Sequence, residues 1–136
     1  MGNAETQLEA PTLPARFTGG CHCGRVRFVV TLRRFRMSEC NCSLCTKKGF
    51  LHLIIDKSDL EIVAGREALS TYTFNTHVAR HHFCSTCGIH PFYVPRSHPD
   101  GYSVNARCLE DVRLAWFELL YFDGQNWEAQ IETYSG

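Results

Sequence analysis

Hydrophobic and polar residues alternate along much of the chain in short stretches, and this pattern predicts a protein built mainly of β-strands. The clearest stretch is Arg25–Thr31, in which Val26, Phe28 and Val30 fall on one face of an extended segment. Other stretches have the length and the branched or aromatic content of strands, namely residues 50–55, 60–63, 70–74, 77–83, 91–94 and 102–105. Turn-forming pairs separate them, among them Gly19-Gly20, Ala64-Gly65, Cys87-Gly88 and Asp100-Gly101.

Two segments depart from this pattern. Residues 1–15 are polar, contain two prolines and show no periodicity, so we expect a flexible N-terminal arm followed by a single folded domain over residues 16–136. Residues 112–122 are ambiguous, because their aromatic and branched content favours a strand while their length allows a helix. Asp123-Gly124 then predicts a turn.

The bulk composition narrows the classes of function. A chain of 136 residues with 44% hydrophobic content is the size of one domain. Basic and acidic residues number 14 each, so the formal net charge is zero and no overall basic surface for nucleic acid is expected. The short basic run Arg33-Arg34-Phe35-Arg36 is interpreted as a solvated loop in preference to a binding patch.

The sequence also suggests a cellular compartment. It has no run of about 18 apolar residues and no secretory signal, which predicts a soluble protein of a reducing compartment, the cytoplasm or also the nucleus. Thiols are therefore expected to be free or bound to metal. Residues 1–6 match the short pattern for myristoylation of Gly2, but no polybasic segment follows to strengthen such an anchor.

The eight cysteines occur mostly in closely spaced groups, CHC, CNCSLC and CSTC, with Cys108 alone. Close pairs from distant parts of a chain are typical of tetrahedral zinc sites. The CHC and CSTC groups are each followed by glycine, which can turn the backbone at positive φ so that amide N–H groups point at thiolates. We therefore predict one closed, structural zinc site with four thiolate ligands, Cys21, Cys23, Cys84 and Cys87.

The third group lies in ECNCSLCTKKG, residues 39–49, and no glycine follows its last cysteine. Cys40, Cys42 and Cys45 supply three ligands from one loop, which leaves a fourth position for water, a substrate or a remote side chain, as in catalytic zinc sites. Two alternatives stay open. Cys108 or a histidine could close the site and make it structural, or the CxxC spacing within the loop could mark a redox pair.

Further residues are candidates for contact with a substrate. Two lysines directly follow the triplet and could offset its charge or hold a carboxylate, and a predicted turn between strands could line a site; these residues are Lys47, Lys48, Asn75, Thr76 and His77. Because side chains alternate along a strand, at most one of His81 and His82 is expected to face the zinc loops. Arg96 and Arg107 could bind a carboxylate, but each is interpreted as a surface residue.

Three stretches carry a family resemblance: FTGGCHCGRVRF, ECNCSLCTKKG and TYTFNTHVARHHFCSTCGIHPFYVPRSHPDGYSVNARCLE. They resemble the family of glutathione-dependent formaldehyde-activating enzymes and centromere protein V, and they extend from residue 17 to about residue 110. The order CxCG, CxCxxC, CxxCG is a specific signal. The segment 72–108 is more similar to the centromere protein V branch than to the bacterial enzymes.

The resemblance implies an Mss4-like fold of small antiparallel β-sheets organised around two Zn²⁺ ions per chain. By position, the structural zinc falls on the two glycine-followed pairs and the second, catalytic-type zinc on Cys40, Cys42 and Cys45. The implied activity is that of a carbon–sulfur lyase, the reversible joining of glutathione and formaldehyde into S-hydroxymethylglutathione, with the glutathione sulfur at the open position of the second zinc. The alternative is a non-catalytic zinc module that binds cytoskeletal or chromosomal protein partners.

Overall fold

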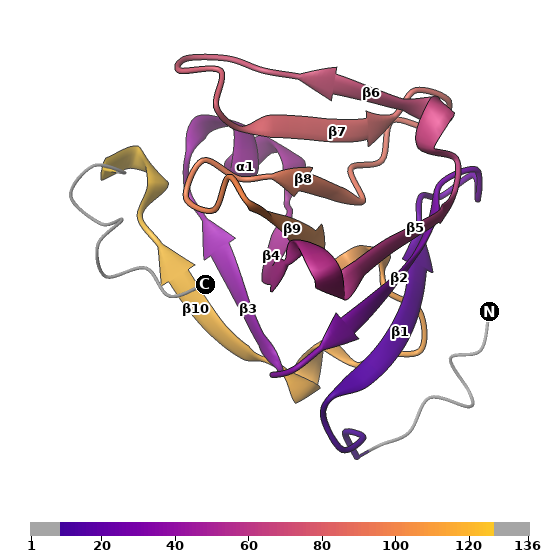
Figure 1. The fold of residues 1–136 in the computed structure, drawn as a ribbon. Helices are drawn as coiled ribbons and strands as arrows, with labels where there is room; N and C mark the ends of the chain where they lie inside the picture. Colours follow the sequence, from indigo (N-terminus) through magenta and orange to yellow (C-terminus); the bar gives the residue numbers. More distant parts are fainter. Residues whose placement is uncertain (1–8, 127–136) are drawn as a thin grey trace.

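The alternating segments of the sequence pair into two β-sheets in the computed structural model, which describes residues 9–126 (Figure 1). The smaller sheet has three antiparallel strands in the order β1-β2-β5, namely β1 (Ala15–Gly20), β2 (Arg27–Leu32) and β5 (Leu60–Ala64). Leu13, just before β1, packs against the core that this sheet helps to cover.

The larger sheet has seven strands. In spatial order they are β10 (Glu118–Phe122), β3 (Arg36–Cys40), β4 (Leu51–Asp56), β9 (Gly101–Asn105), β8 (Phe92–Val94), β7 (Arg80–Cys84) and β6 (Leu69–Tyr72). Neighbours are antiparallel except for β10 and β3, which run parallel, with Phe122 opposite Cys40. The carboxyl ends of these two strands therefore lie side by side.

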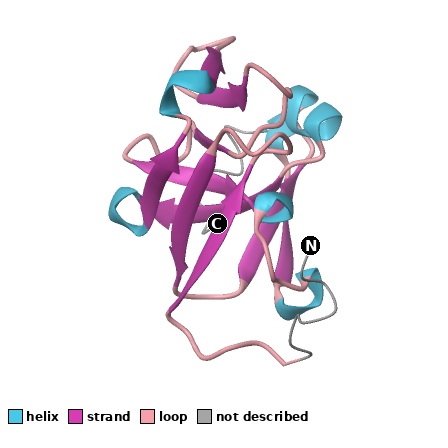
Figure 2. Cartoon of the chain, turned by 90° about the vertical axis from the view of Figure 1, so that its right-hand side faces the viewer, coloured by secondary structure: helices cyan, strands magenta, loops and turns pink. Residues whose placement is uncertain are grey.

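Helices are short and sit at strand ends (Figure 2). The one α-helix of the described residues is α1 (Ser43–Lys48), and the others are single 3₁₀ turns: η2 (Lys57–Asp59), η3 (Arg66–Ala68), η4 (Ala106–Cys108), η5 (Leu114–Trp116) and η6 (Gly124–Asn126). Among residues 9–126, none of these helices has the length and apolar character needed to cross a bilayer.

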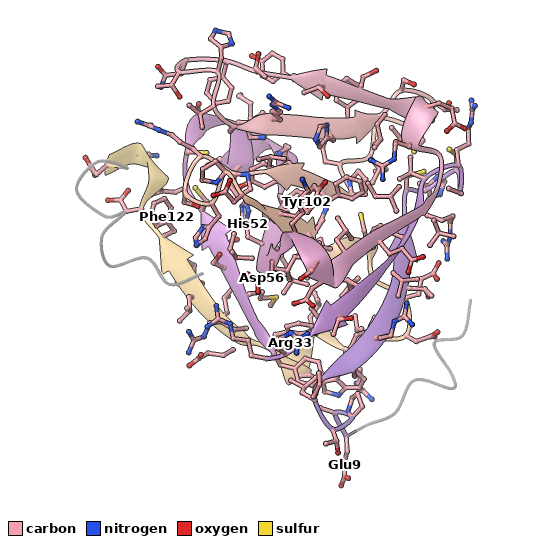
Figure 3. The ribbon with its side chains drawn as sticks, viewed as in Figure 1. Glu9, Arg33, His52, Asp56, Tyr102 and Phe122 are labelled. Carbon is pink, nitrogen blue, oxygen red and sulfur yellow. The ribbon has the colours of Figure 1, made fainter. Side chains whose placement is uncertain are left out.

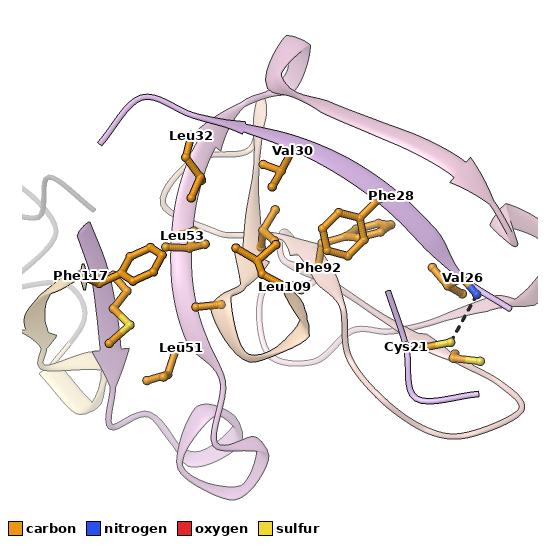
Figure 4. Close-up of a cluster of buried hydrophobic side chains, with 14 of the residues drawn as sticks. Cys21, Val26, Phe28, Val30, Leu32, Leu51, Leu53, Phe92, Leu109 and Phe117 are labelled. Carbon is orange, nitrogen blue, oxygen red and sulfur yellow. Dashed lines mark hydrogen bonds between the residues drawn. The ribbon is translucent and has the colours of Figure 1, made fainter. Parts of the chain in front are cut away.

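The core lies between the two sheets (Figure 4). Val26, Phe28 and Val30, the face predicted from the alternation, are buried to within 1% exposure. Phe28 meets Phe92 of β8 edge to face, with ring centroids 5.8 Å apart. A fully buried side chain of this size contributes about 1.5–3 kcal/mol. This contact between β2 and β8 therefore helps to hold the two sheets together.

The prediction of a mainly β fold is confirmed, and all seven predicted strands overlap observed ones. Two strands were missed. β1 has a single large hydrophobic residue, Phe17, and ends in two glycines, while β3 carries Ser38 fully buried beside Met37. Neither segment alternates clearly, so the alternation rule cannot detect them.

Two boundaries differ from the predictions. The strand expected from residue 77 begins at Arg80, because His77 has a left-handed backbone (φ 58°) and closes a turn through its N–H to the Phe74 carbonyl, 3.0 Å. The ambiguous residues 112–122 divide into the turn η5 and the strand β10. Gly2 and the first eight residues of the expected arm lie outside the described part of the chain.

The basic run at residues 33–36 is largely neutralised by ion pairs. Arg33 bonds Asp59 at 3.0 Å and Arg36 bonds Glu118 at 3.1 Å. Both arginines thus have carboxylate partners on neighbouring elements, and Arg36 lies in β3, so the run is not a solvated loop over its whole length.

Candidate functional site

Four cysteines from two distant segments meet at one end of the molecule. Cys21 and Cys23 lie in the turn between β1 and β2, Cys84 ends β7, and Cys87 follows it. Their four sulfur atoms all lie within 4.8 Å of one another. The cluster links the small sheet to the large one, and it could hold a metal ion.

The donor set of this cluster fits a tetrahedral zinc. Cys21 Sγ and Cys23 Sγ are 3.6 Å apart, and Cys23 Sγ and Cys84 Sγ are 3.7 Å apart. Ligands about 2.3 Å from a tetrahedral zinc would be separated by about 3.8 Å. Gly24 and Gly88 both have positive φ, 84° and 79°, although a Cβ would meet no atom at either position. Glycine is required here by the turn of the backbone and not by lack of space.

The second cluster forms where β3 runs into α1. Cys40 is the last residue of β3, Cys42 caps the helix N-terminus, and Cys45 lies in the first turn of the helix. Cys42 Sγ accepts a hydrogen bond from the Cys45 N–H at 3.3 Å, which holds the loop closed. The three sulfur atoms lie within 4.8 Å of one another, so this cluster could also hold a metal ion.

Contacts between the three thiols perturb their acidity. Hydrogen bonds from Cys40 and Cys45 lower the pKa of Cys42 to about 2, whereas the bond with Cys42 raises the pKa of Cys40 to about 11. The pKa of Cys45 is raised by the same partners and by burial. The raised pKa values of Cys40 and Cys45 disfavour the thiolate forms of these two residues. A bound cation is what would deprotonate all three.

The turn after β10 supports this triplet from the other side. Asn41, between the first two cysteines, donates to Asp123 Oδ1 at 3.1 Å and accepts from the Gln125 N–H at 3.1 Å. Gly124 packs so closely that a Cβ there would overlap Cys40 Sγ and would come within 2.9 Å of Cys42 Cβ. Glycine at this position therefore leaves room for the Cys40 thiol.

Gly124→Ala tests this packing. We expect the variant to fold, because Gly124 lacks a left-handed backbone, but the methyl group must displace the Cys40 thiol. Metal affinity of the triplet should fall about 10- to 100-fold, as for other disturbed ligand supports. Chelator competition measures this, with Thr46→Ala, an exposed residue of α1, as control. Unchanged affinity in Gly124→Ala would show that the contact is dispensable.

A cavity of about 400 Å³ opens beside the triplet, within the size range of small-molecule sites. Aromatic, imidazole and polar side chains from several strands and loops line it, namely Cys40, Cys42, Ser43, Cys45, His52, Phe74, Asn75, Thr76, Ala79, His81, Tyr93, Pro95, Arg96, Ser97, Phe122, Gly124 and Gln125. His52 of β4 and Phe122 of β10 are labelled in Figure 3. A ligand in this cavity would reach the three cysteines of the triplet, which are part of its lining.

Lys48 lies behind one wall of the cavity. Its Nζ is 3.2 Å from His81 Nδ1 and stands over the Tyr93 ring, 4.7 Å from the centroid. Burial lowers the pKa of this lysine to about 8, while the three cysteines act in the opposite direction. Because an ammonium has only donors, His81 Nδ1 accepts, and the proton of the neutral ring is on Nε2. The charge of Lys48 thus partly balances the triplet.

Of the other residues predicted to contact a substrate, two line the cavity and two lie outside it. Asn75, with a left-handed backbone, and Thr76 line the cavity from the loop between β6 and β7. His77, the next residue, is exposed and bonds Thr73 Oγ1 at 2.8 Å, outside the cavity. Lys47 is also exposed and lies outside the lining.

The sequence left open which histidine of the pair 81 and 82, and which arginine of the pair 96 and 107, lies near the site. In each pair the structure places one residue at the cavity and one away from it. His81 is 5% exposed and lines the cavity, whereas His82 points to the opposite face of β7 and bonds Thr71, as strand alternation predicts. Arg96 lines the cavity, whereas Arg107 is exposed away from it.

Cys108 lies away from the triplet. It sits in η4, where its Sγ is 3.8 Å from the His90 carbonyl oxygen. Burial raises the pKa of its thiol to about 12, with further contributions from Cys21 and Cys87 of the four-thiol cluster. The alternative in which Cys108 closes the triplet is therefore not supported by this geometry.

Several lining residues were missed by sequence reasoning, above all His52 and Tyr93. His52 interrupts the hydrophobic run LHLII, and a polar residue inside a predicted buried strand was a signal that could have found it. Tyr93 lies in a hydrophobic stretch that resembles ordinary core, and Phe74 is the last residue of a predicted strand, so nothing local distinguished them. Gly124 was interpreted only as a turn residue.

Comparisons with known proteins agree with this architecture. A Halomonas elongata protein, provisionally named a glutathione-dependent formaldehyde-activating enzyme, is 36% identical over 78 residues, 51% of this chain and 50% of its own, so the chain spans about half the length of that curated relative. A crystal structure of a Rhodobacter sphaeroides protein matches with a TM-score of 0.71 and 38% identity over 77% of this chain and 99% of its own. The family model of the glutathione-dependent formaldehyde-activating enzyme matches residues 16–134, and the chain belongs to that family.

Proposed function

We propose that the protein binds glutathione with its sulfur at the three-cysteine cluster and catalyses the reversible formation of S-hydroxymethylglutathione from glutathione and formaldehyde. The observation that carries this proposal is the arrangement of Cys40, Cys42 and Cys45 at one end of a cavity of about 400 Å³. Family membership supports the choice of thiol and aldehyde. In this proposal each chain holds two zinc ions, structural in the four-thiol cluster and catalytic in the triplet.

Different residues of the chain have different roles in this proposal. A zinc ion held by the triplet would keep a bound sulfur deprotonated at neutral pH. The polar end of the cavity, with Asn75, Thr76 and Arg96, has the hydrogen-bonding groups that the peptide part of glutathione requires. Phe74, His81 and Tyr93 form a stack, with centroids 5.6 Å and 4.8 Å apart, and would supply an aromatic wall for the ligand.

The finer assignments are part of the same proposal. We place the protein nearest the centromere protein V branch on the strength of residues 72–108, and we assign it to the cytoplasm or the nucleus as a carbon–sulfur lyase. Asn75 and Thr76 are proposed to contact the thiol substrate, whereas the exposed Lys47 and His77 would act only through a ligand that extends beyond the cavity.

Ligand-dependent thermal stability tests the proposed function. Glutathione at ten times its Kd should stabilise the metal-loaded protein by about 1.4 kcal/mol, which raises the unfolding midpoint by several degrees. S-methylglutathione, which has no thiol, should give a much smaller shift. The shift should vanish in Cys42→Ser and should persist in Cys108→Ser, a matched substitution outside both clusters.

The outcome separates two classes of function. No shift with glutathione, or an equal shift in Cys42→Ser, would contradict thiol binding at the triplet and favour a zinc module that binds protein partners. Catalysis is then measured by NMR as exchange of ¹³C-formaldehyde with S-hydroxymethylglutathione above the uncatalysed rate.

A further inference from the structure

A buried histidine beside the triplet has no role in binding the thiol. His52 lies in β4, near the middle of the large sheet, opposite Ser38 of β3 and Asn105 of β9. It is 2% exposed and its neighbours Leu51 and Leu53 belong to the hydrophobic core. An imidazole in such a place is costly unless its polar atoms are satisfied. Its retention there calls for a physical reason.

One ring nitrogen of His52 is fully occupied. Nδ1 lies 3.0 Å from Ser103 Oγ and 3.0 Å from the Tyr93 hydroxyl. Burial, followed by the charge of Lys48, lowers the pKa of His52 to about 3, so the ring is neutral at pH 7. A phenol donates more readily than it accepts. The Tyr93 hydroxyl therefore donates to Nδ1, and the proton of the neutral ring is carried by Nε2.

The other ring nitrogen is buried and unsatisfied. His52 Nε2 has no hydrogen-bond partner among the described residues, although the side chain lines the cavity that also exposes the triplet. A buried polar atom without a partner costs about 1–3 kcal/mol. The ring cannot turn away, because Nδ1 is held by two hydroxyls and Phe50 packs against it at 4.7 Å between centroids. A ligand atom that accepts from Nε2 would relieve this cost.

We propose that His52 is a catalytic residue that donates from Nε2 to the oxygen of the one-carbon unit, the aldehyde oxygen in one direction and the hydroxymethyl oxygen in the other. This rests on the proposed function of the triplet. A sulfur atom at the triplet and an oxygen atom at His52 would place the aldehyde carbon between them, inside the cavity. Ser103 and Tyr93 are positioning residues that hold the ring and its tautomer.

The proton balance of the step is closed. The thiol releases its proton to solvent water, its sulfur electron pair forms the C–S bond, and the π pair of C=O moves to oxygen. Oxygen takes the Nε2 proton of His52, and the ring then takes one proton from solvent water, so the protons released and taken up are equal. In the reverse reaction Nε2 recovers its proton from the hydroxymethyl oxygen, and no oxidant is required. His52 thus delivers a proton to the oxygen, while water takes up the proton of the thiol.

Three variants of the metal-loaded protein test this role. His52→Leu removes the donor, and we expect kcat to fall about 100-fold, as when one donor to a developing oxyanion is lost, with KM for glutathione changed less than about twofold. His52→Gln keeps an N–H near the Nε2 position but cannot carry a proton, so kcat should recover in part. His82→Gln, on the opposite face of β7, should match the wild type.

The alternatives are distinguishable. A wild type that fails to accelerate the reaction overturns the proposed function and this proposal with it. An active wild type with an equally active His52→Leu overturns only the role of His52. If His52→Leu does not fold, His52→Gln decides: a kcat equal to the wild type, or kcat and KM changed by the same factor, contradicts proton transfer, and a selective loss of kcat supports it.

Discussion

Cys84→Ser should unfold at temperatures at which the wild type is stable. Cys84 is fully buried at the end of β7, and its sulfur lies 3.7 Å from Cys23 Sγ, in the turn between β1 and β2 of the other sheet. Metal binding by such a cluster is folding free energy, about 10–16 kcal/mol in isolated zinc fingers. A whole domain is stable by only about 5–15 kcal/mol. Loss of one of the four thiolates should therefore remove most of the free energy of unfolding. Urea unfolding followed by circular dichroism measures this loss.

The control for this prediction is Cys108→Ser, which changes a buried thiol outside the four-thiol cluster. It should have the same metal content as the wild type and lose only the small amount of stability expected for a buried thiol, about 1 kcal/mol. A Cys84→Ser protein with an unchanged unfolding midpoint and an unchanged metal content would contradict the structural role of the cluster.

Cys45→Ser should fold but lose the metal of the triplet and nearly all activity. Cys45 is 5% exposed in α1, and its thiol lies next to Cys40 and Cys42. The triplet is contained in one loop, so it joins no separate parts of the fold, and its loss should cost about 1–2 kcal/mol. Activity should fall more than about 100-fold, since loss of a mere supporting contact already costs 10- to 100-fold.

Metal analysis and kinetics together check this result. In the proposed two-metal arrangement, the variant should contain one metal ion fewer per chain than the wild type, with an almost unchanged circular dichroism spectrum. Thr46→Ala, an exposed neighbour in the same helix, should retain both ions and full activity. Full activity in Cys45→Ser, with one metal ion per chain, would place the chemistry elsewhere than the triplet.

Local patterns in the sequence were enough to find most strands and both thiol groups. The spacing of Cys40, Cys42 and Cys45 lies within one loop and one helical turn, so their convergence needs no distant contact. The glycines at positions 24 and 88 identified the two turns that face each other, because each needs a positive φ.

Other parts of the site depend on pairings between distant segments. Ser103 and Tyr93 reach His52 from 51 and 41 positions away, and these distances follow from the order β4-β9-β8 in the sheet. The turn at Gly124 supports the triplet only because β10 pairs in parallel with β3. The sequence of neither strand alone indicates such a pairing.

The sequence by itself determined the class of fold and the two sets of thiols, one of them followed by glycines, because spacing and backbone turns are local properties. Only the tertiary structure decided what surrounds the triplet. Cys108 lies near the four-thiol cluster and not near the triplet. His81 lines the cavity, whereas His82 lies on the opposite face of β7. A neutral His52 with one unsatisfied nitrogen also lines the cavity. These outcomes depend on strand order and register, which link residues that share no local pattern.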